Sequence, residues 1–268
     1  MVPLTSSEQD DRGEPAHPGG VPRYAAGVRV AFALVLLAGC DAALVDMDDI
    51  YTRGAPHFVM CGMDIDDKSS ESLDSIGGAL DRAQIDGTTV LLYGHKPGDL
   101  PNQTLDPATI ELALAGVVDR GMQFATFSDL SAGEVPGSLA LSFDDHDIAG
   151  WTALREMFMH YGARVTFFVS EYPSLTADEK AALRQLQADG HDIEYHSTHH
   201  LNAEDYANAH GAAAYVQDEI VPGLQAMRAD GWAPTIFAYP FGARTVATDQ
   251  ALEPLFAHIR AIHYTCPY

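Results

Sequence analysis

Two short segments carry the residues best suited to chemistry. In the segment HSTHH, His196 and His200 are four residues apart, so a helical turn would place both imidazoles on one side. Two imidazoles and a carboxylate are a usual ligand set for a divalent metal with open positions. In the segment SFDD, Asp144 and Asp145 end an apolar run, 138–143, that is typical of a buried strand. Adjacent carboxylates repel each other unless a cation lies beside them, so we interpret one as a metal ligand and the other as a base.

The composition limits the possible partners. The chain has 268 residues, enough for one large domain or two small ones, and 47% of them are hydrophobic, which allows a sizeable core. Its net charge of −23 argues against nucleic acid, whose phosphates are bound by Lys and Arg. The same charge argues against docking on anionic lipid through a basic patch. Most of these acidic groups are expected to serve solubility.

The first 40 residues are predicted to lie outside the fold, with residues 41–55 as a linker. Residues 1–27 are rich in Pro, Gly and charge, and the apolar run 27–40 is shorter than the ~20 residues that span a bilayer. Such a run after arginines is typical of a secretory signal. The sequence Leu37-Ala38-Gly39-Cys40 resembles the lipobox of bacterial lipoproteins, which implies export and a lipid anchor on Cys40, on the periplasmic side of a membrane. The alternative is an internal apolar helix.

Two cysteines remain after the predicted signal, Cys61 and Cys266. Export would permit a disulfide between them. Buried free thiols are the alternative, and the sequence leaves both open.

From residue 56 onward, short apolar runs alternate with amphipathic stretches. The expected strands are 57–63, 88–93, 123–127, 138–143, 164–170, 192–195, 235–239 and 257–264. The expected helices are 72–85, 110–120, 150–161, 177–188, 203–228 and 248–255. Near-continuous apolar strands indicate parallel strands that are covered on both faces. The alternation therefore predicts an α/β barrel of seven to eight strands or a doubly wound sheet.

The candidate chemical residues follow the ends of these strands. Asp144 and Asp145, His196, Phe241, Asp64 and His95 each come where a predicted strand finishes. In an α/β barrel, active residues lie at the carboxyl ends of the strands. The pattern therefore favours a barrel with one shared site.

Three segments resemble the motifs of the polysaccharide deacetylases, carbohydrate esterase family four. Ser142-Phe143-Asp144-Asp145 resembles the first motif, His196-Ser197-Thr198-His199-His200 the second, and Ala238-Tyr239-Pro240-Phe241-Gly242 the third. They occur in the family's order, with a strand and a helix between neighbours. Each motif alone is weak, whereas the three together are specific.

Segments similar to the family's closing motifs come at the front of the chain. The run 90–95, which ends in His95, is similar to the closing motif, and 59–67 lies where the family has an acidic segment. Residues 117–130 are similar to its last helix and strand. The resemblance thus implies a circularly permuted, TIM-like barrel over 56–268, whose first and last strands are neighbours. Two half-domains that pair with other chains are the alternative.

The resemblance also implies the roles of the site residues. Asp145, His196 and His200 would hold Zn²⁺ or another divalent metal, and Asp144 would be the general base. His95 would be the general acid, and the backbone N–H of Phe241 would bind the oxyanion. The acidic segment offers Asp64, Asp66 and Asp67 to orient His95, and the sequence does not choose among them.

Some residues depart from the family's pattern. Ala238 stands where many members have an arginine that orients the base, and Arg244 is the nearest cation in sequence. His146 replaces the usual glycine after the two aspartates, and the tryptophan often found in the acidic segment is not apparent. The expected activity is N-deacetylation of an N-acetylglucosamine-type polymer. The alternatives are an amidase or esterase on a small acylated compound, and an inactive carbohydrate-binding protein.

Overall fold

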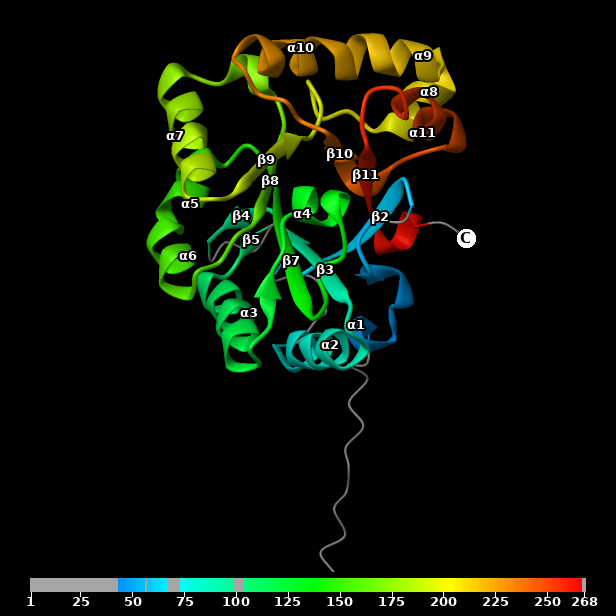
Figure 1. Cartoon of the computed structure of the whole chain (residues 1–268). Coiled ribbons are helices and arrows are strands. Elements are labelled where there is room, and N and C mark those ends of the chain that lie inside the picture. The colour runs from blue at the N-terminus through cyan, green and yellow to red at the C-terminus, as the bar shows by residue number, and fades with distance from the viewer. Residues whose placement is uncertain (1–42, 56, 67–72, 99–103, 267–268) are drawn as a thin grey trace, which may run out of the picture. The chain divides into compact units, whose positions relative to one another are not determined.

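The computed structural model describes residues 43–55, 57–66, 73–98 and 104–266 (Figure 1). By its internal contacts the chain divides into Met1–Leu37 and Ala38–Tyr268, and the described residues belong to the second unit. The predicted signal, the lipobox with Cys40, and Asp67 lie outside the described residues. Within the described ranges, no helix is both long and apolar enough to span a bilayer.

Seven parallel strands close into a barrel. They are β2 (Val59–Asp64), β3 (Thr89–Gly94), β7 (Ser138–Asp145), β8 (Thr166–Val169), β9 (Asp192–Tyr195), β10 (Ile236–Ala238) and β11 (His258–Ile262). Around the ring the order is β7-β8-β9-β10-β11-β2-β3, and β3 pairs with β7 from Thr89↔Ser138 to Gly94↔Phe143. The barrel is confirmed over the doubly wound sheet, because an open sheet would lack this last pairing.

The ring closes as the permuted arrangement requires. The two strands that come first in the chain, β2 and β3, lie between β11 and β7, and β11 pairs with β2 from Ile259↔Val59 to Ile262↔Gly62. The leading and trailing parts of the chain therefore meet at the seam between β2 and β11. Because all seven strands are parallel, their carboxyl ends meet at one mouth of the barrel.

The remaining strands are two residues long. They are β1 (Tyr51–Thr52), β4 (Lys96–Pro97), β5 (Thr104–Leu105) and β6 (Gln123–Phe124). The predicted strand 123–127 is wrong beyond Phe124, because Thr126 caps a helix, α4 (Phe127–Ala132), through a reciprocal capping box with Asp129. Since β6 pairs only with the start of β7, it stays outside the ring.

Helices surround the barrel in Figure 1. They are α1 (Ala43–Asp46), α2 (Leu73–Asp86), α3 (Pro107–Asp119), α5 (Ile148–Ala153), α6 (Arg155–Tyr161), α7 (Ala177–Ala188), α8 (Ala203–His210), α9 (Ala212–Tyr215), α10 (Val221–Ala229) and α11 (Val246–Leu252). Five short helical turns complete the set: η1 (Asp48–Ile50), η2 (Tyr172–Ser174), the π-helical η3 (Val216–Ile220), η4 (Pro240–Gly242) and η5 (His263–Thr265). The predicted helix 203–228 is interrupted: Gly211, with φ of +92°, ends α8.

Two apolar clusters fill the layers. A large one packs the outer side chains of the strands against the helices, and a smaller one includes Met60, Leu91, Ala140, Phe168 and Ile236 from the strands. Successive side chains of a strand point to opposite faces, so the smaller cluster lines the barrel interior. Phe127 and Leu130 of α4 belong to it, so this helix covers the end of the barrel where the strands begin.

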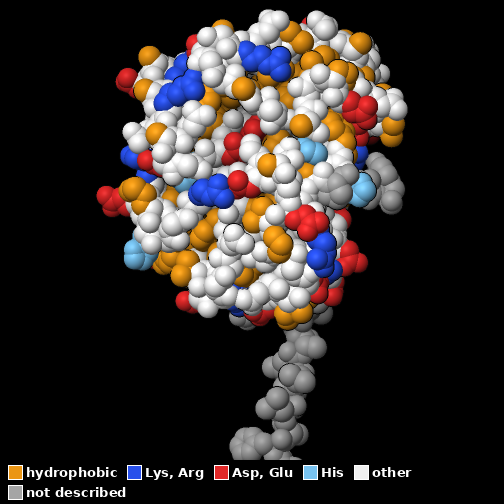
Figure 2. Space-filling model, viewed as in Figure 1, with side chains coloured by type: hydrophobic (Ala, Val, Ile, Leu, Met, Phe, Trp, Pro, Cys, Tyr) orange, Lys and Arg blue, Asp and Glu red, His pale blue; other side chains and the backbone are white. Residues whose placement is uncertain are grey.

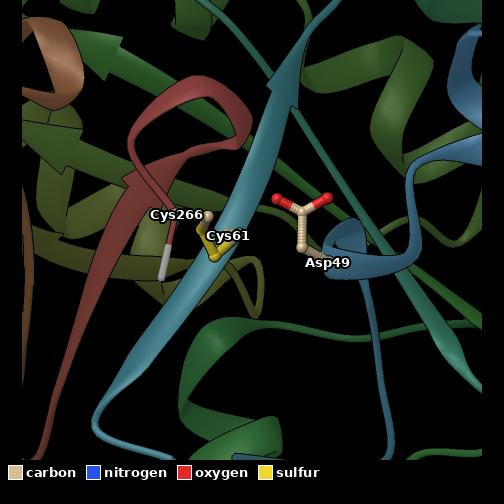
Figure 3. A group of neighbouring side chains, drawn as sticks. All are labelled: Asp49, Cys61 and Cys266. Atoms are coloured by element: carbon tan, nitrogen blue, oxygen red, sulfur yellow. A yellow bond between two sulfur atoms is a disulfide. The ribbon is translucent and has the colours of Figure 1, made fainter. Parts of the chain in front are cut away.

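A disulfide joins the two ends of the described chain across the seam. Cys61 of β2 is bonded to Cys266, 205 residues away, with Cα atoms 5.9 Å apart. Figure 3 shows Asp49 beside this pair. The open question from the sequence is thereby answered in favour of a disulfide. Because it closes a long loop, it limits the freedom of the unfolded chain.

Candidate active site

The strand ends converge on one cavity of about 230 Å³ at the mouth of the barrel. It is lined by Asp64, Tyr93, His95, Asp144, Asp145, His196, His200, Tyr239, Phe241, Gly242, Arg260 and Ile262. All six site residues predicted from the sequence are in this set. Residues from the leading and trailing parts of the chain therefore share one site.

Asp145, His196 and His200 offer three donor atoms that lie within 4.8 Å of one another. The Nε2 atom of His200 is 3.1 Å from Oδ1 of Asp145, and Nε2 of His196 is 3.8 Å from the same oxygen. His196 donates from Nδ1 to the carbonyl oxygen of Ala238 at 2.9 Å, which leaves Nε2 as the free donor atom. Such a contact fixes the orientation and tautomer of a ligating imidazole.

The electrostatic environment keeps His196 and Asp145 in their ligating forms. Burial lowers the pKa of His196 to about 4, so this imidazole is neutral at pH 7. Burial acts to raise the pKa of Asp145, but the hydrogen bond from His200 and the charges of nearby imidazoles outweigh it and hold that pKa well below its usual range. A neutral imidazole and an ionised carboxylate are the forms that bind a metal.

The segment 196–200 is a loop, and the predicted helical turn is wrong. Ser197 and His200 have φ of +80° and +57°, and the loop is held by Ser197 Oγ, which accepts the N–H of His200 at 3.0 Å. Asp145 and Phe241 also have positive φ, +80° and +59°. Non-glycine residues in this region are strained by their Cβ atoms. Four of the five such residues in the described chain thus belong to the site.

A buried glutamate that the sequence analysis missed holds the same loop. Oε1 of Glu219, in η3, accepts the N–H groups of His199 and Leu201, each at 2.9 Å, and Oε2 lies 2.8 Å from Nδ1 of His199. Glu219 is fully buried, whereas the side chain of His199 is 61% exposed. His199 therefore helps to hold the loop 196–200 in place through its hydrogen bonds to Glu219. Glu219 itself lies in a π-helical turn, a feature that is frequent at functional sites.

Arg260, also missed, pairs with Asp144. The guanidinium Nη2 of Arg260 donates to Oδ2 of Asp144, and both side chains are buried. Arg244, the nearest cation in sequence to the third motif, instead pairs with Asp249 and with the carbonyl of Thr265. One feature of the sequence indicates a buried role for this residue: Arg260 stands between apolar neighbours in the middle of strand β11.

His95 faces the cavity with Asp66 behind it. Its Nδ1 donates to Oδ2 of Asp66 at 2.6 Å, and its backbone N–H donates to Oδ1 at 3.0 Å. Burial acts to lower the pKa of His95, but the hydrogen bond to Asp66 and the charges of Asp144, Asp66 and Asp145 raise it to about 9. Of the two described aspartates of this segment, Asp64 and Asp66, it is Asp66 that accepts the hydrogen bonds of His95.

Asp144 and Phe241 each offer an unused polar group. Oδ1 of Asp144 is buried and has no hydrogen-bond partner in the described chain. The backbone N–H of Phe241 donates no hydrogen bond to any described residue. A buried polar atom without a partner is costly. Together with the three nearby donor atoms, these groups fit a metal ion and its water in this cavity.

Two other groups have donors at similar spacing, and both are already bonded. Asp49 lies beside Cys61 and Cys266, whose sulfurs form the disulfide (Figure 3). The other group is Asp64 with Asp66 and His95, where Nδ1 of His95 and Oδ2 of Asp66 already share a hydrogen bond. In the set around Asp145, Nε2 of His196 has no hydrogen bond to a described residue, and the unpaired Oδ1 of Asp144 belongs to the same cavity.

Comparison of the sequence with models of protein families finds a match over part of the chain. The family model described as "Polysaccharide deacetylase" matches residues 133–256, which contain the segments 142–145, 196–200 and 238–242. Over residues 133–256 the chain is similar to the polysaccharide deacetylase family. The resemblance inferred from the three motifs is therefore confirmed for this segment.

One solved structure, IcaB from Ammonifex degensii, supports the fold. It is 16% identical over 65% of this chain and 84% of its own, with a TM-score of 0.54. The deacetylase domain of BpsB from Bordetella bronchiseptica is 14% identical over 80% of this chain and 88% of its own, with a TM-score of 0.47. The Colletotrichum lindemuthianum chitin deacetylase is 24% identical over 45% and 53%, with a TM-score of 0.38. No curated protein matches the sequence.

Proposed function

We propose that this chain is a metal-dependent hydrolase that removes N-acetyl groups from N-acetylglucosamine-type units of a polysaccharide. The observation that carries this proposal is the placement of His95 and its partner Asp66 in one cavity with Asp145, His196 and His200. The similarity of residues 133–256 to the polysaccharide deacetylase family supports the reaction class. Amide hydrolysis needs a proton donor opposite a base and a metal ion. The closed barrel brings the proposed donor, His95, into one cavity with the proposed base and metal ligands.

Each residue has a role in amide hydrolysis. A divalent ion such as Zn²⁺, held by Asp145, His196 and His200, would polarise the acetyl carbonyl and lower the pKa of a water molecule. Asp144, which accepts a hydrogen bond from Arg260, takes the proton of the attacking water. The N–H of Phe241 donates to the oxyanion. His95 then gives its proton to the nitrogen as the C–N bond breaks.

We also propose that the protein is exported. A disulfide in the described fold supports an oxidising compartment, because cytosolic thiols are usually kept reduced. The lipid anchor on Cys40 remains a prediction.

Acetate release from acetylated chitooligosaccharides tests the proposed function. The Zn²⁺-loaded protein is expected to release acetate and to leave free amines, and Asp144→Asn is expected to lower the rate roughly 10²- to 10⁴-fold, the usual contribution of a general base. An exposed aspartate that lies outside the cavity, changed in Asp178→Asn, is the matched control. If the wild-type protein bound the sugar but released no acetate, an inactive carbohydrate-binding protein would be the better description.

The pH dependence follows from His95. A general acid works only while protonated, so activity should hold from neutral pH up to the pKa of His95 and fall about tenfold per unit above it. That pKa is about 9 before a metal ion is considered, and a cation in the same cavity lowers it. The alkaline limb is therefore expected at or somewhat below pH 9. His95→Gln should remove this limb from the kcat profile and lower kcat; an unchanged limb would assign it to another group.

A further inference from the structure

Asp64 is a carboxylate in the cavity that the mechanism above does not use. It ends β2, beside Tyr93 of β3 in the sheet, and lies on the same strand face as Met60 of the barrel interior. One of its oxygens, a ring nitrogen of His95 and an oxygen of Asp66 all lie within 4.8 Å of one another. Asp64 is therefore next to the proposed proton donor.

Only one oxygen of this carboxylate is occupied. Oδ1 accepts the N–H of Asp66 at 2.7 Å, and Oδ2 accepts no hydrogen bond from the described residues. Burial and then the charge of Asp66 raise the pKa of Asp64 to about 6, so the group is still mostly ionised at pH 7. A partly buried carboxylate with one oxygen free of hydrogen bonds from the described residues thus lines the cavity beside His95.

Amide cleavage creates a positive charge at this position. When His95 gives its proton to the amide nitrogen of the tetrahedral adduct, that nitrogen carries two hydrogens and a positive charge. The charge disappears when the C–N bond breaks and its electron pair returns to nitrogen, giving a neutral amine and acetate. An aryl ester differs, because its oxygen leaves as an anion and needs no proton.

We propose that Asp64 binds the departing nitrogen, accepting a hydrogen bond from its protonated N–H, and thereby makes the site selective for amides of amino sugars over esters. The inference rests on the proposed deacetylase function. It assigns Asp64 to the leaving-group side of the cavity, next to His95. The proposed metal ligands, Asp145, His196 and His200, are assigned to the side of the cavity that binds the acetyl group.

The test compares two substrates for the Zn²⁺-loaded protein. For Asp64→Asn, kcat/KM for acetate release from chitooligosaccharide should fall roughly ten- to hundredfold, as expected for a lost hydrogen bond to a charged group. The same variant should hydrolyse 4-nitrophenyl acetate at the wild-type rate or faster, since the departing phenolate is no longer repelled. Asp119→Asn, an exposed change on α3, is the control and should leave both rates unchanged.

Three results would count against the proposal. An equal fall on both substrates would show that Asp64 acts on steps common to amides and esters. A shift of the alkaline limb for the amide, with an unchanged rate on the plateau below it, would show that Asp64 only tunes His95. Loss of bound zinc in Asp64→Asn would make it a support of the metal site. By contrast, a wild-type protein that cleaves the ester and leaves the amide intact would refute the proposed deacetylase function itself.

Discussion

Replacing His200 by alanine should remove bound zinc and lower acetate release by roughly 10³-fold or more. The reason is that a Lewis acid contributes several kcal/mol to such a transition state, and His200 is one of three protein donors. The His200 side chain is 25% exposed, so its loss leaves less of a void than loss of the buried His196 would. Metal content by mass spectrometry and the rate of acetate release check the prediction.

A histidine outside the site provides the control for this variant. His160 is exposed on α6, and His160→Ala should keep one zinc per chain and the wild-type rate. Were His200→Ala to keep both its zinc and its activity, the ligand set would have to be reassigned.

Replacing Arg260 by methionine should damage both stability and catalysis. The guanidinium is buried against Asp144, and breaking a buried pair leaves an uncompensated charge that costs about 3–5 kcal/mol. Asp144 also loses the hydrogen bond that holds its carboxylate in place, so kcat/KM for acetate release should fall as well. Chemical denaturation and kcat/KM measure the two effects.

Arg244→Met separates these two effects. Arg244 is also buried and paired with an aspartate, Asp249, but that pair lies outside the cavity. Arg244→Met should lower the free energy of unfolding and leave kcat/KM of the folded protein unchanged. A fall of kcat/KM in Arg244→Met, with none in Arg260→Met, would make Arg244 the partner of the base.

Sequence patterns predicted the strands, and they predicted that the candidate site residues lie at the mouth of the barrel, because both depend on local order. Apolar runs mark the strands of a barrel covered on both faces, and polar residues directly after them reach its mouth. Even the out-of-order segment with His95 was placed correctly, since ring closure makes the first and last strands neighbours. The cavity contains every one of the six residues expected there.

What the sequence did not predict depends on contacts between distant elements. Arg260 and Asp144 are 116 residues apart in the sequence. Glu219 is 20 residues from His199, whose backbone N–H it accepts. Local spacing instead favoured Arg244, and it suggested a helical turn at 196–200 where positive φ at Ser197 and His200 makes a loop. The pairing of Cys61 with Cys266 likewise required the closed ring.

In the proposed mechanism, one metal ion held by Asp145, His196 and His200 works with His95, which follows the neighbouring strand β3, to hydrolyse an N-acetyl group. Titration of the metal-free protein with Zn²⁺, with acetate release from chitooligosaccharide followed at each addition, tests it most directly. We expect the rate to rise linearly and to level off at one zinc per chain. A rate that does not change with zinc, or no acetate from the protein with one zinc bound, would contradict it.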